Sequence, residues 1–195
     1  MKFLSGRVDQ NSAGRGDAVG RFPRWQIFMK NEQHCRYRRR PATVKSNVLI
    51  IGYGNTLRGD DGVGPRVAEA VGGLNLPGVR TLMCPLLTPE LADPISRVEH
   101  VIFVDAAVDA PQEVQWRKLQ PKESSQLMAH AADPRTMLAL ARDVFGHVPE
   151  AWWLTIPAID LGFCEQFSPA VRRDFKAAVK TIEAFCQSAE TKQLN

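Results

Sequence analysis

The segment 47–64 constrains the fold of this chain more than any other. It opens with a short apolar run, Val48–Ile51, whose β-branched residues and terminal glycine predict a buried strand. A glycine-rich loop follows and carries two adjacent carboxylates, Asp60 and Asp61. A helix is expected directly afterwards, because Pro65 suits a first helical turn. In open α/β sheets, a loop between a strand and the next helix lies at the carboxyl edge, where ligands bind.

The loop is similar to a dinucleotide-binding turn but departs from it in two ways. Residues 52–57 follow G-x-G-x-x-G except that Leu57 replaces the third glycine, where close helix–strand packing needs a small residue. The two acids would also repel a phosphate at the helix N-terminus, although Arg58 offers partial relief. One acid, Asp60, is expected to cap the helix. The second acid, Asp61, is then expected to contact a metal ion or a reacting group.

The rest of the chain alternates strand and helix patterns, which predicts an α/β fold with a doubly wound, mostly parallel sheet and helices on both faces. A length of 195 residues suits one domain with a sizeable core. Further strands are expected at 79–84, 100–106, 113–119 and 151–158. Helices are expected at 63–71, 87–97, 133–145 and 168–188, and Pro94 is expected to disturb the second of them. The strand at 113–119 alternates polar and apolar residues and is expected near an edge.

Charge divides the chain into two parts. Residues 1–46 hold 11 Lys/Arg and 3 Asp/Glu, a net of +8, and residues 47–195 hold 14 and 18, a net of −4. The folded part is therefore not expected to bind nucleic acid. Residues 1–46 lack the apolar centre of a signal peptide, and we expect a disordered, basic extension there. A basic contact arm, or a true start at Met29 or later, are alternatives that stay open.

Two further residues are candidates for chemistry. Asp105 ends the strand expected at 100–106, and an acid at the carboxyl end of a central parallel strand points into the same crevice as Asp61. His130 is one of four histidines and lies in an expected loop, where a histidine considered by itself is usually solvated. Two carboxylates and an imidazole suit Ni²⁺, Zn²⁺ or Mn²⁺, and three protein ligands leave open positions for a substrate.

The cysteines and the apolar runs speak against a disulfide-bonded protein, a cysteine nucleophile and a membrane-spanning protein. The four cysteines form no C-x-x-C pair, and free thiols in a reducing cytoplasm are expected. Cys164 stands beside Glu165, but nothing nearby in the sequence indicates an activated nucleophile. No apolar run approaches the ~20 residues of a membrane span.

The segment Gly52–Gly64 closely resembles the opening motif of the [NiFe]-hydrogenase maturation endopeptidases, G-x-G-N-x-L-x-x-D-(D/E)-G-x-G, at every fixed position. The Val-Asp-Ala sequence around Asp105 resembles a strand end of that family, and His130 lies in the loop where the family has a histidine. Glu165 matches a later G-E motif, although Cys164 replaces the glycine. The resemblance covers about residues 47–188, followed by a tail at 189–195.

The resemblance implies a three-layer, phosphorylase/hydrolase-like domain that is monomeric and cytoplasmic. It implies an endopeptidase that removes the C-terminal extension of a [NiFe]-hydrogenase large-subunit precursor after nickel insertion. Nickel would arrive with this partner, and no organic cofactor is expected. Asp61, Asp105 and His130 would be the catalytic residues and would contact the substrate's nickel. Either the metal or one of the carboxylates could activate the attacking water.

Two other classes of function stay open. A non-catalytic assembly chaperone would bind the immature large subunit and leave its extension intact. A nucleotide-dependent enzyme of the Rossmann type would bind a cofactor and tolerate Asp61→Asn, but Leu57 and the twin acids speak against it.

Overall fold

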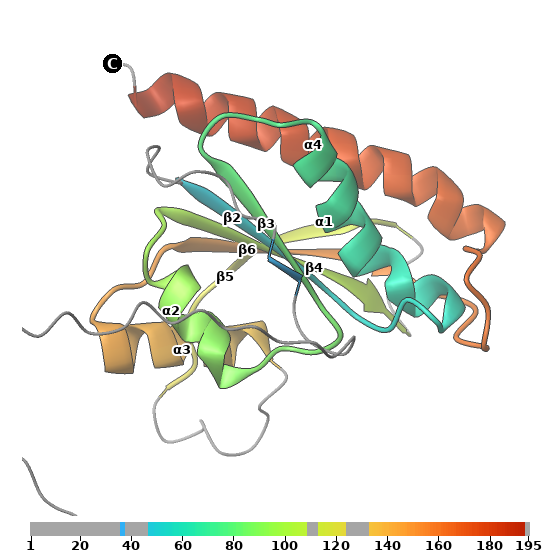
Figure 1. The fold of residues 1–195 in the computed structure, drawn as a ribbon, viewed down its shortest axis with the longest axis horizontal. Coiled ribbons are helices and arrows are strands. Elements are labelled where there is room, and N and C mark those ends of the chain that lie inside the picture. The colour runs from blue at the N-terminus through green and yellow to red at the C-terminus, as the bar shows by residue number, and fades with distance from the viewer. Residues whose placement is uncertain (1–35, 38–46, 109–112, 124–132, 194–195) are drawn as a thin grey trace, which may run out of the picture. The chain divides into compact units, whose positions relative to one another are not determined.

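A computed structural model describes residues 36–37, 47–108, 113–123 and 133–193, which belong to one compact unit, Glu32–Asn195. A six-stranded sheet with the order β1-β3-β2-β4-β6-β5 forms its centre (Figure 1). The strands are β1 (Arg36–Tyr37), β2 (Val48–Tyr53), β3 (Val79–Cys84), β4 (His100–Ala107), β5 (Gln115–Leu119) and β6 (Glu150–Pro157). The helical segments are η1 (Gly59–Gly62), α1 (Val63–Gly73), η2 (Pro89–Leu91), α2 (Ala92–Ile95), α3 (Pro134–Phe145) and α4 (Pro169–Gln193).

The four central strands run parallel and the two edge strands run antiparallel to their neighbours. β2 pairs with β3 and β4, and β4 pairs with β6, all in parallel. β1 and β5 close the two edges in antiparallel pairs with β3 and β6. This arrangement confirms the doubly wound, mostly parallel sheet and the expected edge strand near residue 117. β1 lies inside the range 1–46; the rest of that range is outside the described residues, so disorder there stays a prediction.

Helices cover both faces of the sheet and give three layers, as expected. α1 and α4 lie on one face, and α2 and α3 lie on the other (Figure 1). Successive side chains of a strand point to opposite faces. On β2, Leu49, Ile51 and Tyr53 therefore join the core under α2 and α3, whereas Val48 and Ile50 join the core under α1 and α4. Every residue of β2 is buried, as its apolar sequence predicts.

The helix expected over 87–97, with a disturbance at Pro94, is present as two short pieces rather than as one long helix. The segment forms a short 3₁₀ turn, η2, followed by the four residues of α2. Pro94 has no N–H to donate to the carbonyl of Glu90, which interrupts a continuous helix between the two pieces. Ser96 then caps the end of α2. Its N–H donates to the carbonyl of Ala92, and its hydroxyl donates to the carbonyl of Asp93 over 2.8 Å. At the other end of the chain, α4 continues to Gln193, beyond the expected end near residue 188.

Among the described residues, Cys84, Cys164 and Cys186 are not joined to one another by disulfide bonds, and Cys35 lies outside these residues. Within the described ranges, no helix combines the length and the apolar character needed to cross a membrane.

Candidate active site

Two glycines bring the acidic loop against the ends of the central strands. A Cβ atom added at Gly64 would lie 2.5 Å from the carbonyl oxygens of both Tyr53 and Val104. A Cβ atom added at Gly52 would overlap the carbonyl oxygen of Gly64. The backbone of the first turn of α1 can approach β2 and β4 this closely because neither glycine carries a side chain. The approach places η1, with its two acids, at the carboxyl ends of β2 and β4.

The loop fixes the Asp61 carboxylate by a local hydrogen bond. The backbone N–H of Asn55 donates to Asp61 Oδ2 over 2.8 Å. Gly54 makes the tight turn possible, because its φ of +132° is one that side chains rarely adopt and an added Cβ would overlap the carbonyl oxygen of Asp61. Asp61 is half-buried, so its carboxylate keeps access to solvent. A carboxylate oxygen has two lone pairs, which leaves acceptor capacity for a metal or a substrate.

Asp105 is held by a tyrosine at the end of the neighbouring strand. The hydroxyl of Tyr53, which is 8% exposed, donates to Asp105 Oδ2 over 2.6 Å. Burial raises the pKa of Asp105 to about 6, and the negative charge of Asp61 adds to the rise. The hydrogen bonds from Tyr53 and Ala106 oppose it. The charge of Asp61 thus reaches Asp105, and Asp105 can exchange a proton near neutral pH.

Asp60 has a different task from the one predicted. Its side chain makes no N-cap hydrogen bond to η1 or α1, so the expected helix cap was wrong. The side chain is fully buried and accepts hydrogen bonds from the N–H groups of Ile159 (3.0 Å), Asp160 (3.0 Å) and Ser168 (2.8 Å). Burial alone would raise the pKa of Asp60, but these hydrogen bonds lower it below the usual range. The first acid is therefore structural and ties the 55–62 loop to the segment 159–168.

No protein-family model and no curated protein sequence matches the chain. Solved structures do. A hydrogenase maturating endopeptidase, HybD, from E. coli superimposes with a TM-score of 0.59 at 21% identity, over 73% of this chain and 93% of that one. A hydrogenase 2 maturation peptidase from a Thaumarchaeota archaeon gives a TM-score of 0.53 at 25% identity, over 71% of this chain and 97% of its own. The [NiFe]-hydrogenase maturation protease HybD from Thermococcus kodakarensis gives a TM-score of 0.55 at 23% identity, over 72% of this chain and 99% of its own.

The chain has the fold of the hydrogenase maturation endopeptidases. This fold confirms the three-layer α/β architecture that the motif at residues 52–64 implies. The likeness extends over almost the full length of each of these peptidases, so the shared part is the whole domain rather than one βαβ unit.

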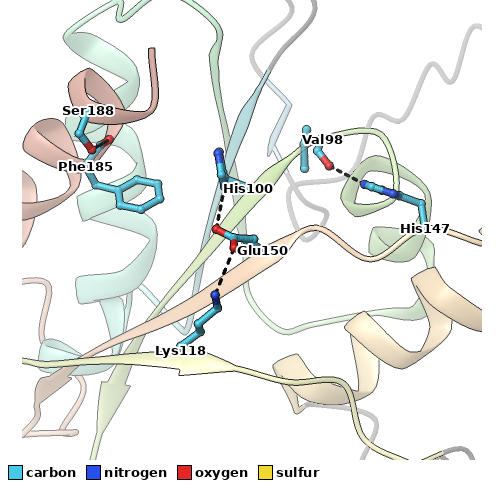
Figure 2. A network of polar contacts seen from close by, with 7 residues as sticks. All are labelled: Val98, His100, Lys118, His147, Glu150, Phe185 and Ser188. Carbon is cyan, nitrogen blue, oxygen red and sulfur yellow. Dashed lines mark hydrogen bonds and ion pairs between the residues drawn. The ribbon is translucent and has the colours of Figure 1, made fainter. Parts of the chain in front are cut away.

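The histidine expected in this site, His130, lies outside the described residues. His100 and His147 lie elsewhere: His100 begins β4, and His147 follows α3 (Figure 2). His100 Nδ1 is 3.8 Å from Glu150 Oε2, and a ring nitrogen of His147 is 3.0 Å from the carbonyl oxygen of Val98. Five residues of extended strand separate His100 from Asp105, about 16 Å. Neither described histidine therefore reaches the acidic pair.

The ends of the segment that carries His130 are described. Lys122 and Asp133 form an ion pair of 2.7 Å, and the N–H of Lys122 donates to the carbonyl of Arg135. Asp133 also caps α3 by accepting from the N–H of Arg135 over 2.8 Å. The pKa of Tyr53 is raised by burial, by the charge of Asp105 and, more weakly, by the charge of Asp133. The amino end of α3 thus lies within electrostatic range of the residue that holds Asp105.

Sequence reasoning missed Tyr53 and Thr155. Thr155 stands opposite Asp105 in the β4–β6 register and is 2% exposed, and its hydroxyl has no hydrogen-bond partner among the described residues. The alternation of side chains along β2 and β4 gives Tyr53 and Asp105 the same face, which is a signal available from sequence. Using it requires knowing that β2 and β4 are neighbours in this register, which only the structure supplies.

Proposed function

We propose that the protein is an endopeptidase that removes the C-terminal extension of a [NiFe]-hydrogenase large-subunit precursor after nickel insertion. One observation carries the proposal: Asp61 in η1 and Asp105 at the end of β4 are near enough for the charge of Asp61 to raise the pKa of Asp105, in a domain with the fold of hydrogenase maturation endopeptidases. The complete motif at residues 52–64 supports it further, because its glycines and its second acid build this edge.

In this proposal, Asp61, Asp105 and His130 contact the nickel that the substrate brings. Asp61 and Asp105 each hold one hydrogen bond through Oδ2, from Asn55 and Tyr53, and these bonds orient the two carboxylates before the substrate arrives. Oxygen and imidazole nitrogen donors suit Ni²⁺. The role of His130 in this proposal comes from the resemblance of its position in the sequence, because His130 lies outside the described residues.

The chemistry needs a water molecule that attacks one peptide carbonyl. With a pKa of about 6, Asp105 is ionised at neutral pH and basic enough to accept a proton from that water. Nickel held in the substrate would supply Lewis acidity to the same carbonyl. Tyr53 stays protonated, because burial raises its pKa, and it can keep donating to Asp105 throughout. Asp105 as general base and nickel as electrophile are compatible roles.

The nucleotide-dependent alternative gains no support from the loop. Leu57 is 55% exposed and does not stand between the helix and the strand. The helix α1 instead approaches the strand β2 closely at Gly52 and Gly64. Asp60 and Asp61 lie in η1, directly before the first turn of α1. Carboxylates at that place are unfavourable neighbours for a pyrophosphate.

A cleavage assay tests the proposal. The purified protein is mixed with a nickel-loaded large-subunit precursor from the same organism, and the product mass is measured. Wild type should release a C-terminal peptide. Asp61→Asn keeps an oxygen for the Asn55 N–H but removes the charge, so we expect at least a 100-fold lower kcat/KM.

Asp160→Asn is the matched control, because the Asp160 side chain is exposed and asparagine keeps an oxygen for the hydrogen bond that Asp160 Oδ1 accepts from the N–H of Gly162. It should cut the precursor within about twofold of wild type. A stable complex in which wild type leaves the precursor intact would refute the peptidase and favour the assembly chaperone. Equal losses in Asp61→Asn and Asp160→Asn would refute the assignment of the site.

A further inference from the structure

The helices α1 and α4 lie side by side on one face of the sheet (Figure 1). Side chains of α1, of α4 and of the segment before α4 line a groove. Its volume is about 790 Å³. Phe167 and Phe175 line it with aromatic surface, and their ring centroids are 5.9 Å apart. Four cationic side chains surround this aromatic surface: Arg66, Arg172, Arg173 and Lys176.

The charge of the groove is opposite to that of the domain. Residues 47–195 carry a net charge of −4, whereas the four cations of the groove face a single lining acid, Glu69. Arg173 is held by Asp174, with Nε 3.3 Å from Oδ1. Arg172 and Lys176 are exposed and stand one turn apart on α4. These two side chains are therefore placed to meet an anionic partner.

The groove and the candidate active site share one loop. Arg66 donates to the carbonyl oxygen of Glu165 over 3.2 Å and lies over the ring of Phe167, 5.5 Å from its centroid. The residue before Glu165, Cys164, accepts a hydrogen bond from the N–H of Gly59. Asp60 then holds the same loop from the other side. A protein chain lying in the groove would thus follow this loop toward Asp61.

We propose that the groove docks an acidic segment of the protein substrate, with an apolar side chain of that segment packed against the paired rings of Phe167 and Phe175. The proposal rests on the proposed function, since it names the large-subunit precursor as the partner. Acidic side chains of the segment pair with Arg172 and Lys176, and the aromatic surface buries the apolar side chain. The groove acts as a second contact that increases affinity for the intact precursor and leaves the chemistry to the acidic pair.

Charge complementarity argues against other occupants. The chain's own residues 1–46 have a net charge of +8, so the cationic groove repels them. Nucleic acid needs a continuous basic surface, whereas this groove is a small basic area on a domain of net charge −4. A second copy of this chain is a possible occupant that the test below separates from the precursor.

Charge reversal with a matched control tests the proposal. Lys176→Glu and the double variant Arg172→Glu with Lys176→Glu alter the groove. Lys180→Glu makes the same change one turn further along α4, outside the groove. With the nickel-loaded precursor in 50 mM NaCl, we expect KM to rise about tenfold for the double variant and severalfold for Lys176→Glu, with kcat within twofold. Lys180→Glu should stay within twofold, and 500 mM NaCl should shrink the differences.

The equilibrium Kd for the intact precursor is measured in parallel, so that the groove is tested even when wild type cuts nothing. A Kd or KM that is the same in the double variant and Lys180→Glu overturns the groove proposal and leaves the peptidase standing. Photo-crosslinking from Ala70→p-benzoylphenylalanine, which lines the groove, should capture an acidic peptide of the precursor. Capture of a second copy of this chain, or oligonucleotide binding that the double variant loses, also overturns it.

Discussion

Asp105→Asn is expected to make the folded protein more stable while it removes the activity. The pKa of Asp105 is raised from 3.8 in a model peptide to about 6, mainly by burial. One pKa unit corresponds to about 1.4 kcal/mol, so the ionised carboxylate costs the folded state about 3 kcal/mol at pH 7. Asparagine has no charge to bury and can still accept the hydrogen bond from Tyr53. The free energy of unfolding should therefore rise by up to about 3 kcal/mol at pH 7.

The sign of the pH dependence makes this prediction specific. Between pH 4 and pH 6 the folded state binds more protons at Asp105 than the unfolded state does, so wild-type stability falls as the pH rises through this window. Urea unfolding at pH 3.5, 5 and 7 should show the two proteins nearly equal at pH 3.5 and furthest apart at pH 7. Asp160→Asn, at an exposed position, controls for charge removal.

Two results would refute this reasoning. One is an Asp105→Asn protein that is less stable than wild type at pH 7. The other is a difference in unfolding free energy that stays constant from pH 3.5 to pH 7, because burial of a charge cannot produce it. Cleavage of the precursor should be lost in the same variant by at least 100-fold, as expected for a group that contacts the substrate. A gain in stability with a loss of activity is the pattern of a strained functional site.

Three further predictions follow from single contacts. Tyr53→Phe removes a hydrogen bond that lowers the pKa of Asp105, so the acidic limb of the kcat/KM profile should move up from about 6 by about one pH unit; an unchanged limb contradicts this. Asp60→Asn turns an amide donor toward at least one of the three backbone N–H groups that Asp60 accepts from. Urea unfolding should show that the free energy of unfolding falls by about 3 kcal/mol, and an unchanged value contradicts the role of Asp60. Gly64→Ala forces a methyl group against two backbone carbonyls and should cost about 3 kcal/mol or more by the same measurement, with Gly73→Ala, where an added Cβ meets nothing within 4 Å, as the tolerated control.

Local chemistry was enough to predict the part of the fold that builds the site. The apolar run at 48–51 and its terminal glycine gave β2, and Pro65 placed the start of α1. The strand at 100–106 was also predicted, because a parallel strand buried on both faces is continuously apolar, as Val101–Val104 are. The strand at 79–84 was predicted as well, although it contains Arg80 and Thr81. The disturbance expected at Pro94 is local as well, and it divides the helical segment within 87–97 into η2 and α2.

The sequence could not predict the hydrogen-bond partners of Asp60 and Asp105, because these partners come from distant segments of the chain. The hydrogen bond between Tyr53 and Asp105 joins residues 52 positions apart, and the one from Ser168 to Asp60 joins residues 108 positions apart. Neither leaves a local pattern, because each depends on the order of strands in the sheet and on the path of the 159–168 segment. Asp60 was expected to serve structure and does so, but through another loop rather than through its own helix.

The two adjacent aspartates show how burial divides identical side chains between structure and chemistry. Asp60 is fully buried and satisfied by three N–H groups of one loop, so its charge is neutralised by fixed dipoles and it has little left to offer a substrate. Asp61 accepts one N–H group, remains half-buried and raises the pKa of Asp105 through its charge. Under the proposed function, a site that contacts the substrate's nickel needs carboxylates that are held firmly but keep acceptor capacity for the metal. Asp60 fixes the loop through its three hydrogen bonds, and the carboxylate of Asp61 keeps acceptor capacity for a ligand.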